Sequence, residues 1–203
     1  MKRLIPLLTA ATLSLAFASA NAGDLNAMMQ GCNDCHGDNG VSQWTDVPTI
    51  AGLAEFVHVD ALYIYQEEAR PCAESKYRQG DTSRPATTMC ALAADLSEDD
   101  IDALAAAYAE LPYVKAKQDF DAGLAAAGEK LHNEHCDKCH SEAGTNPEDE
   151  AGMLGGQMMG YLTQSFADYK SGDREQPSKM KAKMDMLSGD DEAALVNYYG
   201  SIQ

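Results

Sequence analysis

The chain has 203 residues and is strongly acidic: 32 Asp and Glu against 15 Lys and Arg give a formal net charge of −17. Such a surface repels the phosphates of nucleic acids and the headgroups of anionic membranes, which excludes both as main binding partners. The acidic residues are spread over both halves of the chain. They therefore fit a basic protein partner or, equally, a saline or alkaline habitat.

The first 22 residues have the pattern of a secretory signal peptide. Lys2 and Arg3 precede an apolar stretch, residues 4–18, which is too short to span a bilayer with margin, and Ala20 and Ala22 are small residues of the kind that signal peptidase reads. We expect cleavage after Ala22, export to the periplasm and a soluble mature chain, because no second run of about 18 apolar residues follows. An uncleaved membrane anchor is the alternative.

Four of the six cysteines lie in two Cys-x-x-Cys-His motifs, Cys32–His36 and Cys136–His140. Two thiols one helical turn apart can each form a thioether with a vinyl group of one porphyrin, and the next histidine can then bind the iron. A redox dithiol, or a zinc site made of both cysteine pairs, leaves the two histidines unexplained. We therefore predict two covalently attached haem c groups. The attachment residues are Cys32, Cys35, Cys136 and Cys139, and the axial histidines are His36 and His140.

A second pattern repeats at a constant offset of 91 residues. Met89 pairs with Met180, and Ser97 pairs with Ser188, each serine standing before acidic residues and an apolar helical pattern. Methionine opposite histidine is a common axial pair in electron-transfer cytochromes. We therefore predict Met89 and Met180 as the sixth ligands of the two irons.

Other residues are weaker candidates for these ligands. Met89 is the only methionine between His36 and Cys136, but the second half contains further methionines, which we interpret mainly as core residues. These are Met153, Met158, Met159, Met184 and Met186, of which we assign all but Met153 to the core. His58 stays open as an alternative ligand in the first half. The remaining histidines, His132 and His135, are too close to their own motif to reach the opposite haem face.

The pattern predicts an all-α protein made of two similar halves. We expect a first domain over residues 23–111, a linker over residues 112–118 and a second domain over residues 119–203. No segment alternates convincingly enough for a strand. The expected helices are Gly23–Gln30, Ala61–Ala69 and Asp99–Leu111 in the first half, and Ala122–Glu134, Tyr161–Lys170 and Asp190–Ile202 in the second.

The first half carries an insertion bracketed by the two remaining cysteines. His36 and Met89 are 53 positions apart, whereas His140 and Met180 are 40 apart, a difference of 13 residues. Cys72 and Cys90 flank this insertion and have no counterparts in the second half. In an oxidising compartment we expect a disulfide between them. Free buried thiols, or Cys90 as a haem ligand or reactive thiol, are the alternatives.

With these residues in place, the chain resembles the dihaem cytochrome c4 family over its mature length. Within that family it is most similar to the cytochrome subunit of flavocytochrome c sulfide dehydrogenase. The segments that carry the resemblance are residues 116–121, 130–132, 136–140, 154–157 and 161–162, together with Met180.

The resemblance implies two tandem class I cytochrome c domains, packed about a pseudo-twofold axis with their haem propionates close together. An FAD-containing subunit would oxidise sulfide, and this chain would accept the electrons one at a time and pass them to a soluble acceptor. The resemblance also implies a proline carbonyl that accepts a hydrogen bond from the axial histidine. Pro48 fits that role for His36, but Gly152 occupies the matching position of the second half. There, we expect a different carbonyl to serve His140.

Two other functions compete with this one. A free-standing cytochrome c4 shuttle to a terminal oxidase would use the same chemistry. A catalytic dihaem thiosulfate dehydrogenase or peroxidase would need an open or thiolate-bound haem, which the predicted methionine ligands oppose. Three lysines around Met180 form the densest basic cluster of the mature chain, and we interpret them as solvated side chains or as a collar that meets acids of a redox partner. They are Lys179, Lys181 and Lys183.

Overall fold

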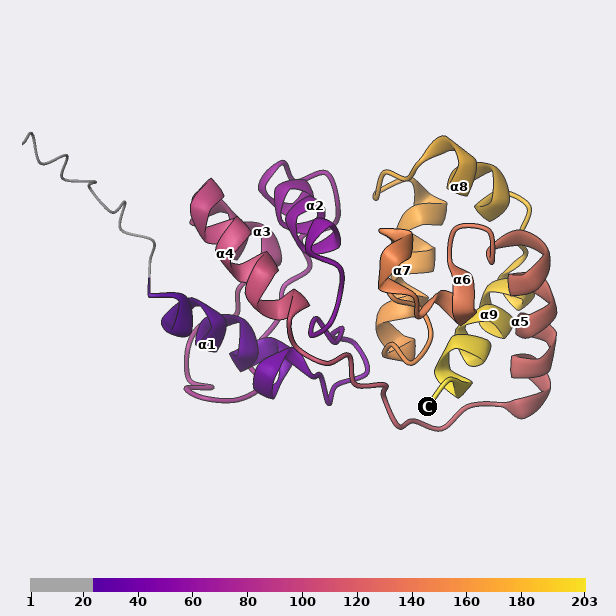
Figure 1. The fold of residues 1–203 in the computed structure, drawn as a ribbon, viewed down its shortest axis with the longest axis horizontal. Coiled ribbons are helices and arrows are strands. Elements are labelled where there is room, and N and C mark those ends of the chain that lie inside the picture. The colour runs from indigo at the N-terminus through magenta and orange to yellow at the C-terminus, as the bar shows by residue number, and fades with distance from the viewer. Residues whose placement is uncertain (1–23) are drawn as a thin grey trace, which may run out of the picture.

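The computed structural model describes residues 24–203, so the expected signal peptide lies outside the described residues. Figure 1 shows two groups of helices, one from each half of the chain, joined by an extended segment along the bottom of the view. Apart from an isolated bridge between Ser75 and Thr87, the described residues form no β pairing. The all-α prediction is confirmed. None of the helices in this part of the chain combines the length and apolarity needed to cross a membrane.

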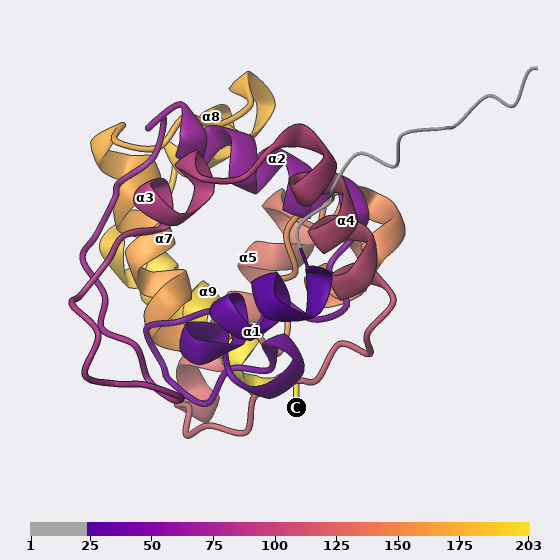
Figure 2. The same ribbon diagram turned by 90° about the vertical axis from the view of Figure 1, so that its left-hand side faces the viewer.

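Among the described residues, the first half contains four α-helices and the second contains five. The first half contains α1 (Leu25–His36), α2 (Glu55–Gln66), α3 (Met89–Ala94) and α4 (Glu98–Ala109). The second half contains α5 (Ala122–His135), α6 (Ser141–Gly144), α7 (Met159–Ser171), α8 (Ser178–Met184) and α9 (Gly189–Ser201). Seen end-on, the two groups lie one behind the other along the long axis (Figure 2).

Two helices differ from the sequence-based expectation. The first was expected to end at Gln30, but α1 continues through the whole first haem motif and stops at Gly37, whose φ of 85° is accessible mainly to glycine. The second was expected to begin at Ala61, but α2 begins at Glu55. The polar residues inside the first haem motif gave no signal that α1 continues through it. The apolar pattern of α2 is weak, so it gave little information about where that helix begins.

The closing helices of the two halves begin in the same way. The Ser97 side chain accepts a hydrogen bond from the Asp100 backbone N–H, and the Asp100 carboxylate accepts one from the Ser97 backbone. Ser188 and Asp191 repeat this reciprocal pair at the start of α9. Each reciprocal pair is a capping box, which satisfies two backbone N–H groups that the first helical turn leaves unpaired. This explains why both helices start where the sequence predicts.

In the second half, α9 packs along α5 over a buried apolar core. Leu195 and Tyr199 on α9 are almost fully buried and contact Leu162 of α7. The two helices approach most closely at Gly128, where a β-carbon would lie 2.1 Å from the Ala194 carbonyl oxygen. A glycine is therefore required at this crossing.

The two halves contact each other directly. The Gln157 side chain accepts a hydrogen bond from the Thr49 backbone N–H at 2.8 Å and donates one to the Thr49 carbonyl at 2.9 Å. The Thr45 carbonyl accepts a further bond from the Tyr161 N–H at 2.7 Å. Because Thr49 and Gln157 are buried, these bonds fix how one half sits against the other.

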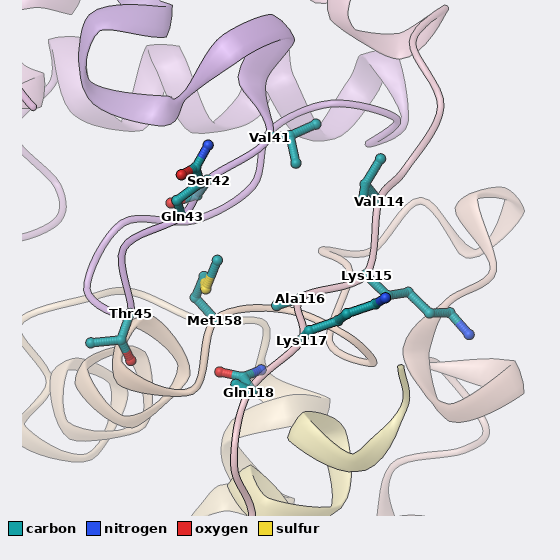
Figure 3. A pocket seen from close by; sticks show the side chains of 10 residues that line it. All are labelled: Val41, Ser42, Gln43, Thr45, Val114, Lys115, Ala116, Lys117, Gln118 and Met158. Atoms are coloured by element: carbon teal, nitrogen blue, oxygen red, sulfur yellow. The ribbon is translucent and has the colours of Figure 1, made fainter. Parts of the chain in front are cut away.

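The linker also lies against this interface. Ala116 donates its N–H to the Gly156 carbonyl at 2.7 Å, and the Tyr113 hydroxyl donates to the Gly155 carbonyl at 3.1 Å. Figure 3 shows a cleft between the linker, the loop that contains Val41 to Thr45, and Met158 of the second half. Its walls come from both halves, so its shape depends on their packing.

The crossing of α5 and α9 gives a stability test. Gly128→Ala should lower the free energy of unfolding of the haem-loaded protein by about 1–3 kcal/mol, because the added methyl overlaps the Ala194 carbonyl. Chemical denaturation measures the change. Gly189→Ala is the control, since a β-carbon there meets nothing within 4 Å. Equal stability of the Gly128 variant and the wild type would contradict this packing.

Candidate haem-binding sites

The first motif lies on the last turns of α1, and its histidine is held from outside the helix. The Nδ1 atom of His36 is 2.9 Å from the Pro48 carbonyl oxygen, which confirms the contact expected for Pro48. Donation from Nδ1 leaves Nε2 as the nitrogen that can bind iron. Burial lowers the pKa of His36, so the imidazole is neutral, as a metal ligand must be.

The second motif leaves its helix earlier. α5 ends at His135, and Cys136 caps it, so Cys139 and His140 lie in the following turn. The Nδ1 atom of His140 is buried and has no hydrogen-bond partner within residues 24–203. The expected replacement carbonyl is therefore absent there, and that expectation is wrong. The physical reason is the loss of the proline: the backbone at Gly152 does not take its place.

A repeated tyrosine ties each closing helix to its motif. The Tyr108 hydroxyl on α4 is 2.8 Å from the Asn33 side-chain oxygen, inside the first motif. The Tyr199 hydroxyl on α9 is 3.1 Å from Nδ1 of His132, one turn before the second motif. Each hydroxyl also hydrogen-bonds the first cysteine of its motif. The two tyrosines are nearly inaccessible to solvent, so they fix both motifs at equivalent places.

The predicted methionine ligands stand at the starts of two short helices. Met89 is the first residue of α3, after the N-cap Thr88, and Met180 lies in the first turn of α8; both side chains are half-buried. Met184 is buried in the core, as expected. Met186 is 58% exposed, so its assignment to the core is wrong: it lies in the turn after α8 has ended.

His58, the alternative ligand of the first site, is buried on α2 with its ring 5.9 Å from that of Tyr108. Burial and the nearby His36 lower the pKa of His58 to about 4, so it is neutral at pH 7. His132 is fully buried against Tyr199, in agreement with its exclusion as a sixth ligand.

The structure forms the disulfide expected between Cys72 and Cys90, with their Cα atoms 5.6 Å apart. This bond removes Cys90 as a thiolate ligand. Among the motif cysteines, burial raises the pKa of the Cys32, Cys35 and Cys136 thiols. No group of three or more His, Cys, Asp or Glu residues is arranged to hold a metal in the described part of the chain.

Sequence reasoning missed a cluster of tyrosines and arginines between the halves. The Arg70 guanidinium lies 4.4 Å above the Tyr65 ring, and the Arg174 guanidinium lies 4.4 Å above the Tyr169 ring. The two pairs are related by the repeat: 104 positions separate the tyrosines, the arginines and the two motifs alike. The sequence did contain a signal for this cluster, as a repeat with an offset of 104 positions. The offset falls to 91 after the insertion, so a search at 91 positions does not find these residues.

The cluster is positively charged. Neither arginine forms an ion pair with a carboxylate among the residues that the structure describes. Burial raises the pKa of Tyr161, but the charges of Arg70 and Arg174 and hydrogen bonds outweigh it and lower the pKa to about 8. Two guanidinium groups are thus collected here without an ion pair to a carboxylate among the described residues, and the carboxylates that act on the tyrosines, Asp60 and Asp168, do so only through longer-range charge. A haem fits this donor set, since it brings propionates for the arginines, vinyl groups for the thiols and iron for the histidines.

Ligation by the two methionines can be tested separately. Met89→Ala and Met180→Ala should each remove about half of the weak near-infrared absorption of ferric haem bound by methionine sulfur, and each should lower one reduction potential. Matched controls are His58→Leu, which introduces the residue that the second half has at this place, and Met186→Ala, an exposed methionine. If Met186→Ala removes half of this absorption and Met180→Ala does not, Met186 is the ligand of the second haem. If Met89→Ala leaves the absorption unchanged and His58→Leu alters the spectrum of the first haem, His58 is the ligand there.

The disulfide gives a second test. In unfolded, unreduced protein, Cys72 and Cys90 should resist alkylation and should react once a reductant is added. Because the bond closes a loop of 18 positions, replacing both cysteines by serine should cost about 3 kcal/mol of unfolding free energy. Immediate alkylation without reductant would show that the bond does not form.

The chain is similar to known cytochromes. No family model matches the chain. It is 28% identical to cytochrome c4 of Pseudomonas aeruginosa, over 95% of this chain and 94% of that protein. It is 26% identical to a thiosulfate dehydrogenase electron acceptor of Stutzerimonas stutzeri, over 89% of this chain and 82% of that protein.

A solved structure gives the same result. Reduced recombinant cytochrome c4 from Pseudomonas stutzeri superposes with a TM-score of 0.69 and 25% identity, covering 90% of this chain and all of that one. At this coverage the likeness spans both halves of the chain. The chain is therefore similar along most of its length to the dihaem cytochromes c4, a family whose members carry two covalently bound haem c groups.

Proposed function

We propose that this chain is a periplasmic electron carrier that accepts electrons one at a time from a flavoprotein sulfide dehydrogenase subunit. Electron transfer is the activity of the family; the donor and the periplasmic location are the proposal. The observation that carries it is the repeat itself. Each half pairs a Cys-x-x-Cys-His motif with a methionine at an equivalent place, which fills both axial positions and leaves no open iron for a substrate.

In this proposal each half is one cytochrome domain, residues 23–111 and 119–203, joined by the linker over 112–118. Cys32 and Cys35 attach the first haem, and Cys136 and Cys139 attach the second. The axial pairs are His36 with Met89 and His140 with Met180. Bound haem supplies one-electron iron chemistry. The chain contributes burial, orientation of the histidines and exclusion of water from the sites.

Arg70 and Arg174 have a clear task in such a carrier. Both guanidinium groups are held over tyrosine rings between the halves and lack carboxylate partners within the described segment. The family resemblance implies that the propionates of the two haems lie close together. We assign to the two arginines the balancing of that negative charge, which favours close approach of the two groups.

A second donor is favoured by one finding. A relative at 26% identity is named as the electron acceptor of a thiosulfate dehydrogenase, so a thiosulfate dehydrogenase is the alternative source of electrons. The resemblance in the linker and the second motif favours the sulfide dehydrogenase. In both cases this chain receives electrons, and the substrate chemistry takes place on its partner.

Purification from the native host at low salt distinguishes these donors. A co-purifying protein with a flavin spectrum, whose addition with sulfide reduces both haems, supports the proposed donor. A co-purifying haem protein that reduces the chain with thiosulfate supports the second candidate. A chain that purifies alone and reduces only a terminal oxidase contradicts both and favours a free shuttle.

The role of the arginines is tested by redox titration. Arg70→Gln and Arg174→Gln should each lower the reduction potentials, because loss of a nearby positive charge stabilises the ferric state. Lys130→Gln, which removes an exposed charge on α5, is the control. Unchanged potentials in both arginine variants would show that these side chains do not face the haems.

A further inference from the structure

We propose that the insertion of the first half is a fixed cover over the Cys35 side of the first haem site, so that protein partners exchange electrons at the open Cys139 side of the second. The partner that fits this open side is a redox protein with an acidic rim. The inference rests on the proposed electron-transfer function and adds to it the place of exchange.

The cover is a closed loop with a narrow base. The Cys72–Cys90 disulfide ties its two ends together. Just inside that bond, Ser75 and Thr87 exchange backbone hydrogen bonds of 2.8 and 2.9 Å. Two successive cross-connections restrain a loop of this length much more than either alone, because each reduces the number of conformations available to the chain between them.

The tip of the loop is wrapped around Asp34, a residue inside the first haem motif. The N–H groups of Arg78 and Gln79 donate to the Asp34 carbonyl at 2.8 and 3.1 Å. The Arg84 guanidinium forms an ion pair with the Asp34 carboxylate and lies over the Tyr77 ring. Asp34 is only 6% exposed, so the cover is bound to the motif by both backbone and charge.

The backbone of the loop comes very close to the motif. A β-carbon on Gly80 would lie 2.6 Å from the Asp34 carboxylate, which only glycine permits. The Lys76 carbonyl oxygen lies 3.9 Å from the Cys35 sulfur. With haem attached, this sulfur is a thioether, so the contact becomes van der Waals packing rather than a hydrogen bond. Cys35 is 8% exposed as a result.

A second set of contacts holds the loop from the other side. Arg78 forms an ion pair with Asp46 at 2.5 Å, and the Gln79 side chain donates to Asp38 at 2.9 Å. Both acids belong to the segment that follows the first motif. The cover is therefore anchored before and after the histidine, which distinguishes it from a surface loop attached only at its ends.

The second site is open at the same place. An offset of 104 relates Asp34 to Lys138 and Cys35 to Cys139, and both second-half residues are exposed. The insertion has no counterpart there. Thus the residue that anchors the cover and the cover itself occur together in one half and are both missing from the other.

Charge defines the partner of the open side. Lys138 lies beside Cys139, and the positive charge of Lys183 is close enough to Cys136 to act on its pKa. Lys181 is different, because it forms an ion pair at 2.7 Å with Asp185, the C-cap residue of α8. The chain as a whole carries a net charge of −17. The exposed lysines beside the second motif are therefore a local positive patch that attracts an acidic surface of a partner. Of the collar expected from sequence, Lys183 is the lysine that acts on the second motif, and Lys138 within the motif adds to it.

The cover is tested on the haem-loaded protein by NMR. An inert gadolinium chelate should broaden the shifted methyl signals of the second haem more than those of the first. Arg84→Ala, which removes the ion pair to Asp34, should make the two haems similar. Lys76→Ala removes one charge from the same loop but keeps its backbone carbonyl, and it should behave as the wild type. Equal broadening of both haems in the wild type would overturn the proposal.

The exchange side is tested by kinetics with an acidic redox protein. Lys138→Glu with Lys183→Glu should lower the association rate at low salt by at least about tenfold and should weaken its salt dependence. Charge reversal at Lys76 on the cover should change the rate much less. The opposite ranking would overturn the inference but leave the proposed function intact, because the chain would still carry electrons.

Discussion

The structure depends on how each haem motif is held against its closing helix. Tyr108 and Tyr199 come from equivalent places on α4 and α9, and each hydrogen-bonds into the motif region of its own half. Both tyrosines are buried, so the bonds are not exchanged for bonds to water. The capping boxes fix where these helices begin. Together they place two thiols and a histidine at one site in each half.

Charge is distributed unevenly in this acidic protein. Most of the carboxylates are exposed, whereas two arginines are collected between the halves over tyrosine rings. A buried cation without a carboxylate partner is costly unless another anion compensates it. Haem propionates are such anions, and they would make the contact between the halves depend on both cofactors. The buried pair of Thr49 and Gln157 supplies the neutral part of the same interface.

The two halves share a plan but present different surfaces. The first is tied down by a disulfide, an ion pair to Asp34 and backbone contacts over Cys35, whereas the second exposes Cys139. Their histidines also differ: His36 donates to Pro48, and no carbonyl within the described residues meets Nδ1 of His140. A hydrogen bond to the far nitrogen makes a ligand histidine more basic. The two predicted haem sites therefore have different electronic and steric surroundings.

The sequence alone determined the chemistry and the repeat. The two motifs, the all-α class and the serine caps follow from residue types and spacing, because local geometry governs them. The Cys72–Cys90 disulfide follows from the two cysteines that flank the insertion, and the Pro48 contact was implied by the family resemblance. The course of the insertion and the arginine cluster were decided only by tertiary structure. Arg84 and Asp34 are 50 positions apart, and Arg70 meets Tyr161 across the interface. Such pairs depend on how separate elements pack, and no local pattern encodes that.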